Sequence, residues 1–247
     1  LFSLYAVNAE VAAIRDRIRE ALPGEVRLQW WHEVIDAGFG RSADGHPVAE
    51  ALLRTIDEHH LPRSAFANYL EARMFDLFDD PMPTRGDLEG YCGETASAII
   101  QLAAMILDPT AAVKQAELAG HAGCAQGITG LLRLLPLHRA RGQCYVPRDI
   151  LAAAGTTPEE FVASPDGVAS RRAVEAMIAL ASEHLAAFRK HAGALPAILR
   201  PAFLPLALTP AYLGRLSASG AGAPTSSSGL SALRRHWLLL RAASRGW

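Results

Sequence analysis

The stretch AGCAQGITGLLRLLPLHRARGQCYVPRD, residues 122–149, decides the fold of this 247-residue chain. It begins as a predicted helix with glycine at positions 123, 127 and 130, and the helix is expected to end at Pro136, before a basic segment. Small residues let a helix lie close to a neighbouring helix or a ligand. Four arginines against one aspartate give the stretch a formal charge of +3, so any site here favours an anion over a cation.

The composition of the whole chain is that of an ordered globular protein. Half of the residues are hydrophobic and 20% are charged. The net charge of −1 argues against a protein that binds nucleic acid by bulk electrostatics. No run of eighteen apolar residues occurs, so we expect no membrane-spanning helix. Because the chain begins at Leu1, we expect residues upstream that could carry a targeting segment.

The three cysteines, Cys92, Cys124 and Cys144, are widely spaced and form no C-x-x-C pair. Structural zinc sites and disulfide frameworks have paired or regularly spaced cysteines. We therefore expect reduced thiols and neither a zinc site nor a disulfide framework.

Apolar residues at steps of three and four predict helices along most of the chain. We expect one helical domain over residues 1–216, a flexible linker over 217–229, where the sequence is SASGAGAPTSSSG, and a basic amphipathic helix over 230–247. That last helix either lies on a membrane surface or packs back onto the helical body. The predicted helices of the domain are 4–22 (ended by Pro23 and Gly24), 46–58, 64–79, 87–107, 170–191 and 195–216.

Several short sequences, in their order along the chain, resemble the squalene/phytoene synthase family: LYA, RLQWW, HPVAEAL, YC, GCAQ and RGQCYVP. The resemblance extends from Leu4 to about Pro210. It implies an all-α, isoprenoid-synthase-type helical bundle around a central cavity. It also implies an activity, since enzymes of this family join two prenyl diphosphates head to head, with Mg²⁺ held by two acidic motifs.

Most of the acids of those two motifs are absent here. The resemblance places the first motif at Ala12 and Asp16, so one of its two carboxylates remains. The acids of the second motif fall at Leu134, Leu137 and His138. Because Mg²⁺ prefers hard oxygen ligands, we expect no metal site. Asp16 alone is interpreted as a solvated or arginine-paired acid.

Both altered motifs resemble one non-catalytic branch of the family. This branch contains the mitochondrial respiratory complex I assembly factor and its bacterial relatives. The matching sequences here are AVNAEVA, with Asn8, and GCAQGITGLLRLLPLH, with Pro136 and His138. The leading hypothesis is therefore a catalytically degenerate protein without a cofactor that assists assembly of respiratory complex I or binds a lipid or protein partner. It is expected in the cytoplasm, peripheral on the inner face of a bacterial membrane, or in a mitochondrial matrix.

Two other hypotheses stay open. In the first, the chain is an active, Mg²⁺-dependent prenyltransferase of the squalene/phytoene type, and replacement ligands for the metal come from Asp16, Asp76, Asp79 and Asp80. The alternative interpretation of Asp76, Asp79 and Asp80 is that they form a solvated acidic helix end without a metal.

In the second, a basic remnant of the second motif binds a lipid phosphate or prenyl diphosphate without metal, because guanidinium groups suit phosphate oxygens. Within it, His138 is either a pH-sensitive anion ligand or a surface or capping residue. The remnant consists of Arg133, His138, Arg139, Arg141 and Tyr145.

Overall fold

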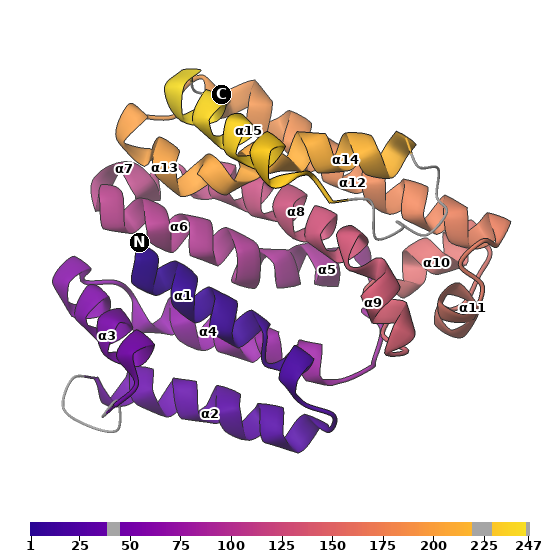
Figure 1. Cartoon of the computed structure of the whole chain (residues 1–247), viewed down its shortest axis with the longest axis horizontal. Helices are drawn as coiled ribbons and strands as arrows, with labels where there is room; N and C mark the ends of the chain where they lie inside the picture. The colour runs from indigo at the N-terminus through magenta and orange to yellow at the C-terminus, as the bar shows by residue number, and fades with distance from the viewer. Residues whose placement is uncertain (39–44, 219–228, 246–247) are drawn as a thin grey trace.

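The computed structural model describes residues 1–38, 45–218 and 229–245, and all of the regular structure within these ranges is helical (Figure 1). The predicted all-α fold is confirmed. The helices are α1 (Phe2–Ala12), α2 (Ala21–Ala37), α3 (Pro47–His59), α4 (Arg63–Met74), α5 (Arg85–Cys92), α6 (Ala98–Leu107), α7 (Pro109–Val113), α8 (Ala116–Arg133), α9 (Leu135–Ala140), α10 (Arg148–Ala154), α11 (Pro158–Ala163), α12 (Val168–Ala192), α13 (Arg200–Phe203), α14 (Thr209–Ala218) and α15 (Ala232–Arg245).

Helix α8 lies in the middle of the bundle and contacts α5, α6, α12 and α14 (Figure 1). Helices α1 to α4 form a layer on one side of the α5–α6 segment, and α12 to α15 lie on the other. The short helices α9, α10 and α11 lie together at one end of the molecule. The stretch chosen from the sequence therefore supplies the central helix of the fold.

Two glycines allow α8 to lie against the α5–α6 segment. A Cβ atom added at Gly123 would overlap the backbone nitrogen and Cα of Ser97. One added at Gly127 would lie 2.8 Å from the Sγ of Cys92. At the same crossing, the hydroxyl of Ser97 donates a hydrogen bond to the carbonyl oxygen of Gly120 at 3.1 Å. The segment that α8 meets is π-helical, over Gly93–Ser97, and this local widening interrupts the helix predicted for residues 87–107.

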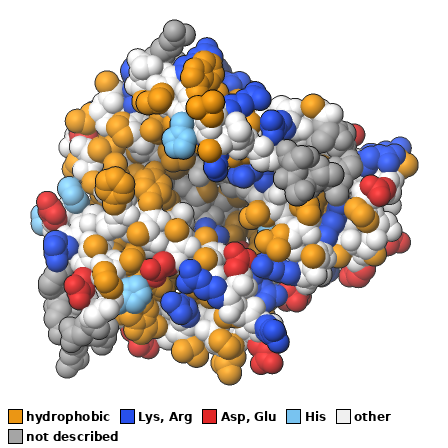
Figure 2. All heavy atoms as spheres, viewed as in Figure 1, with side chains coloured by type: hydrophobic (Ala, Val, Ile, Leu, Met, Phe, Trp, Pro, Cys, Tyr) orange, Lys and Arg blue, Asp and Glu red, His pale blue; other side chains and the backbone are white. Residues whose placement is uncertain are grey.

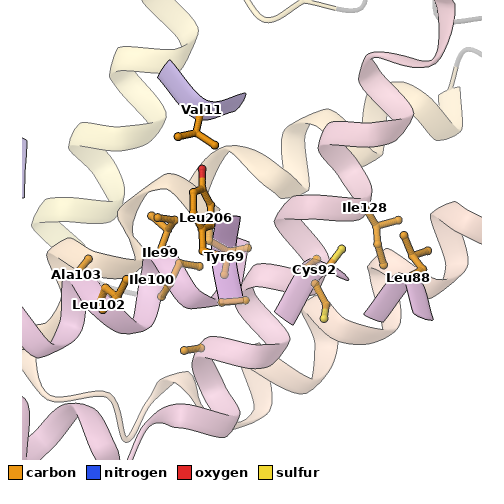
Figure 3. Packing of buried hydrophobic residues seen from close by; sticks show 14 of the residues in the cluster. Val11, Tyr69, Leu88, Cys92, Ile99, Ile100, Leu102, Ala103, Ile128 and Leu206 are labelled. Carbon is orange, nitrogen blue, oxygen red and sulfur yellow. The ribbon is translucent and has the colours of Figure 1, made fainter. Parts of the chain in front are cut away.

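One continuous core joins the layers. Figure 3 shows Val11 and Tyr69, from the N-terminal helices, beside Ile99 and Ile100 of α6 and Leu206 of the C-terminal half. Each of these side chains is at most 5% exposed. Burying an aliphatic or aromatic side chain contributes roughly 1.5–3 kcal/mol, so contacts between the layers are a main source of the stability of this fold.

The predicted helix 4–22 is wrong in its second half. Helix α1 ends at Ala12, a 3₁₀ turn follows over Arg15–Arg17, and the chain is extended at Ile18. Pro23 does not end a helix but lies in the first turn of α2. Backbone N–H groups in a first turn have no acceptor within the helix, so a proline there breaks no hydrogen bond. Leu22, placed on the buried stripe by its spacing, is 67% exposed.

Proline also explains two further differences. The helix that was expected to end at Pro136 is α8, and it ends earlier, at Arg133. Pro136 lies in the first turn of the next helix, α9. The helix predicted for residues 195–216 is divided into 3₁₀ turns, α13 and α14, because it contains several prolines that cannot donate a backbone hydrogen bond. The predicted helices 46–58 and 170–191 are confirmed to within two residues at each end as α3 and α12.

The C-terminal helix α15 packs back onto the body against the 3₁₀ segment Leu204–Leu208. Leu230 is buried just before it, and Nη1 of Arg215 donates a hydrogen bond to the carbonyl oxygen of Gly229 at 2.6 Å. The linker predicted for residues 217–229 falls mostly outside the described residues, and its first two residues end α14.

Within the described ranges, two segments are long and apolar enough to cross a membrane by length and composition alone: Arg85–Leu107 and Ala197–Ala218. The first runs through the middle of the bundle, and the second is broken into short helices. The three cysteines are free thiols, as predicted, and all three are buried.

Replacement of Gly123 by alanine tests the crossing of α8. The added methyl group meets backbone atoms that cannot rotate away, so we expect the free energy of unfolding to fall by about 1–3 kcal/mol in urea titrations. The matched control is Gly120→Ala in the same helix, where a Cβ meets no atom within 4 Å. It should instead raise stability by roughly 0.5–1 kcal/mol through helix propensity. Equal effects of the two substitutions would contradict this account.

Candidate functional site

A cavity of about 570 Å³ opens between α1, the α5–α6 segment, α8 and α14. Figure 2 shows a hollow near the centre of the face in view, with basic side chains along one edge. The wall combines small residues of the two crossing segments with aliphatic and aromatic groups, so much of it is apolar. The lining residues that carry the argument below are Tyr5, Asn8, Ala12, Arg73, Tyr91, Gln126, Gly130, Arg133, Leu134, Tyr212 and Arg235.

Three arginines, from three separate elements, give the cavity its electrostatic character. Arg73 comes from α4, Arg133 from the end of α8 and Arg235 from α15. The guanidinium carbon of Arg133 lies 3.7 Å from the ring centre of Tyr212, a cation–π contact that fixes it at the wall. Among the described residues, no aspartate or glutamate lines the cavity. The cavity therefore favours an anion.

The residues of the cavity do not fit Mg²⁺. This ion prefers carboxylate oxygens together with water or phosphate, whereas the ionised side chains here are guanidinium groups. Within the ranges that the structure describes, no cluster of three or more His, Cys, Asp or Glu side chains could hold a metal ion.

The first acidic motif is divided between two places. Asn8 and Ala12 line the cavity from α1, and the amide oxygen of Asn8 accepts a hydrogen bond from the Tyr69 hydroxyl at 2.9 Å. Asp16 lies beyond the end of α1, so it does not share a helix face with Ala12. It forms an ion pair of 2.8 Å with Arg141 and is 53% exposed, which matches the interpretation of an arginine-paired acid.

Asp76 is buried, and the expectation of a solvated acid is wrong for it. One carboxylate oxygen accepts hydrogen bonds from the hydroxyls of Tyr91 at 2.8 Å and Tyr145 at 2.9 Å, and the other accepts one from Arg73 at 3.0 Å. Burial raises the pKa of both tyrosines, so they remain donors near neutral pH. A carboxylate that takes three donors inside the protein anchors structure and is poorly placed to ligate an ion.

Asp79 and Asp80 are exposed, as predicted for a solvated acidic helix end. Asp79 pairs with Arg15 at 3.2 Å across the surface. Neither Asp79 nor Asp80 lines the cavity. The four acids considered as replacement metal ligands are therefore not brought together around the cavity.

The predicted basic remnant does not converge on one site either. Of its five residues, only Arg133 lines the cavity. The guanidinium of Arg139 lies 4.4 Å from the ring centre of Phe161, Arg141 pairs with Asp16, and Tyr145 donates to Asp76.

His138 is buried in α9, so the alternative of a surface or capping residue is wrong. Its ring lies 4.5 Å from that of Tyr145. Burial lowers the pKa of His138 to about 4, and the positive charge of Arg141 acts in the same direction, while Asp76 opposes it. The imidazole is therefore neutral at physiological pH and supplies no charge to an anion site.

Sequence reasoning missed several cavity residues. The sequence places Arg235 in a basic helix without relating it to a cavity, and no motif marks Arg73, which is spaced i,i+3 from Asp76. Gln126 belongs to the GCAQ motif, which by itself does not predict a role for the side chain. In the described part of the chain, the side-chain oxygens of Gln126 and Tyr5 are buried without a hydrogen-bond partner. Both residues line the cavity, so these oxygens could bind a polar group of a ligand.

Sequence comparison identifies relatives of two kinds. The profile of the squalene/phytoene synthase family matches residues 1–240. The chain is 28% identical over 214 residues to NADH dehydrogenase (ubiquinone) complex I, assembly factor 6 of Rattus norvegicus, a match over 87% of this chain and 64% of that protein. It is 26% identical over 161 residues to the presqualene diphosphate synthase of Sinorhizobium fredii, over 65% of this chain and 57% of that protein. The chain thus spans less than two thirds of these relatives.

Structural comparison agrees on the fold. A crystal structure of a dehydrosqualene synthase in complex with ligand superposes with a TM-score of 0.79 at 18% identity, over 98% of this chain and 84% of that one. At this identity the likeness establishes the architecture alone. The predicted isoprenoid-synthase-type bundle is confirmed.

Protonation of His138 should make the protein sensitive to acid. The folded pKa of about 4 lies below the unfolded value of 6.5, so protons bind the unfolded chain first. The stability associated with the neutral ring is complete above pH 6.5 and is lost as the pH falls from 6.5 towards 4. We expect this residue to account for about 2 kcal/mol of the loss between pH 7 and pH 5 in urea titrations. His138→Phe should remove that part, and an unchanged pH dependence in the variant would contradict the assignment.

Proposed function

This chain belongs to the squalene/phytoene synthase family, and we propose that it uses the fold of that family without the metal-dependent condensation. In this proposal the protein is catalytically degenerate and assists assembly of respiratory complex I. Its cavity holds an anionic amphiphile, a prenyl diphosphate or a lipid phosphate, in the absence of Mg²⁺. The observation that carries the proposal is a cavity lined by three arginines and, among the described residues, by no carboxylate.

The charges explain why such a cavity would bind without turnover. Departure of pyrophosphate from an allylic carbon requires stabilisation of the charge that develops on the leaving group, which Mg²⁺ supplies when carboxylates hold it. Here Arg73 is already paired with Asp76, so Arg133 and Arg235 are left to contact an anion. Guanidinium groups bind phosphate oxygens through directed hydrogen bonds, and the apolar wall suits a prenyl or acyl chain.

The assembly role is supported by the relatives and not by the cavity. The relative from rat bears the name of a complex I assembly factor, and the match covers 87% of this chain. The chain spans 64% of that relative, so the role is proposed for the matching region. We propose a respiratory-complex subunit or assembly protein as the protein partner.

An active prenyltransferase is the second candidate, and a specific observation favours it: a presqualene diphosphate synthase is also among the relatives. In this case the chain would transfer prenyl groups, with Mg²⁺ as cofactor. Asp16 and Asp76 would then have to leave Arg141 and the two tyrosines to reach the cavity. Breaking those contacts opposes this candidate.

Helix α15 supports a peripheral position on a membrane. Three apolar side chains of α15, Leu233, Trp237 and Leu240, are 81%, 56% and 69% exposed to solvent. The exposed Arg234 and Arg241 lie beside them. Apolar and basic groups on one amphipathic helix favour the surface of an anionic bilayer. We therefore propose the inner face of a bacterial membrane, or the matrix side of a mitochondrial one, as the location.

Calorimetric titration of the protein with a farnesyl diphosphate analogue tests the cavity. We expect binding that does not require Mg²⁺ and that weakens about tenfold in Arg133→Ala and in Arg235→Ala, because each removes a charge-assisted contact. Arg141→Ala is the matched control, since this arginine pairs with Asp16 away from the cavity, and its affinity should not change.

The outcomes separate the two candidates. Binding that depends strictly on Mg²⁺ would favour the active transferase. Absence of binding in both conditions would remove the lipid-binding part of the proposal and leave the assembly role to rest on protein contacts.

Cosedimentation with vesicles tests the membrane contact of α15. Exchange of Arg234 and Arg241 for glutamate should release the protein from vesicles rich in anionic lipid, because each basic residue near such a surface contributes about 1 kcal/mol. Arg171→Glu and Arg172→Glu on α12 give a control with the same change of net charge. Equal release in both double variants would contradict a specific role of α15.

A further inference from the structure

A second concavity, a groove of about 680 Å³, runs between α2 and α4 and is separate from the central cavity. In Figure 1, α2 forms the edge of the molecule opposite α15. We call this concavity the α2–α4 groove. Its walls are formed by Leu22, Glu25, Val26, Leu28, Gln29, Trp30, His32 and Glu33 of α2 and by Ala67, Leu70, Glu71 and Met74 of α4.

The α2–α4 groove has a largely apolar lining, and two of its apolar residues, Leu22 and Val26, lie outside the hydrophobic core. Leu22 and Val26, one helical turn apart, are 67% and 62% exposed, and Trp30 on the next turn is half-buried. The core uses a different stripe of α2, which includes Leu28 and Trp31. A second, outward apolar stripe on a helix that already has a buried one is typical of an interaction surface.

The rim of the α2–α4 groove is acidic. Glu25, Glu33 and Glu71 line it, and among the described lining residues there is no lysine or arginine. The carboxylate of Glu33 accepts a hydrogen bond from Gln29 at 3.1 Å and has no basic partner there. Three carboxylates around an apolar floor repel an anionic bilayer and attract a cationic partner.

We infer that the α2–α4 groove binds a basic amphipathic helix of a partner protein. The walls from Leu22 to Glu33 extend over eleven residue steps of α2, about 17 Å at 1.5 Å per residue. A groove of this length accommodates about three turns of helix, with apolar side chains at i, i+4 and i+7 on the floor and lysine or arginine at the rim. The inference rests on the proposed assembly role, for which it specifies the chemistry of the partner.

The experiment uses a fluorescein-labelled, 14-residue amphipathic helical peptide of leucine and lysine as the probe, and fluorescence anisotropy of the full chain as the readout. We expect saturable binding that weakens as salt is added, because the rim contributes by charge. Val26→Lys and Glu71→Lys should each weaken it about tenfold. Val113→Lys, on α7 and outside the groove, is the matched control because Val113 is similarly exposed, at 68%, and it should bind as the native chain does.

Both groove positions are exposed at the surface, so the variants should fold, and Leu22→Lys provides an independent substitution of the same floor. The absence of saturable binding would overturn the inference, as would an equal loss in Val113→Lys. Self-association of the protein that the groove variants abolish would also overturn it, since the occupant would then be a second copy. Titration of the cavity with the farnesyl diphosphate analogue should be unchanged in all of these variants, which separates failure of this inference from failure of the proposed function.

Discussion

The close crossing of α8 and the π-helical segment is the constraint on which the rest of the structure depends. At Gly123 the two backbones approach so closely that no side chain fits between them. This contact places α8 in the centre of the bundle, and Gln126, Gly130 and Thr95 all line the cavity beside it. The cavity is therefore a consequence of where small residues occur in two helices, and it exists whether or not any chemistry takes place in it.

The distribution of charge follows from the same arrangement. Asp76 is surrounded by two tyrosines and Arg73, and removal of one member would leave an uncompensated group inside the protein. The Asp76 carboxylate therefore has a structural role, while Asp16 forms an ion pair with Arg141 at the surface. The arginines that remain at the cavity give it the opposite polarity from a site that binds metal ions.

Three surfaces contribute to the proposed function, each by binding a different partner. The cavity offers basic groups to an anionic amphiphile, α15 presents arginines beside exposed apolar residues, and the α2–α4 groove presents carboxylates around an apolar floor. In Figure 1, α15 and α2 lie at opposite edges of the molecule. In the proposed function, a protein held at a membrane through one edge engages a partner through the opposite edge.

The sequence by itself determined the family and the all-α bundle, because apolar spacing and the order of short motifs are local properties of the chain. Its glycine positions indicated that α8 lies close to a neighbouring helix or a ligand. The sequence also indicated that Asp16 is a solvated or arginine-paired acid. Only the tertiary structure decided that Arg133 and Arg235 meet at one cavity, that Asp76 and His138 are buried, and that Leu22 is exposed. Each of these depends on contacts between residues far apart in sequence, and no local pattern encodes which helix will cover a given side chain.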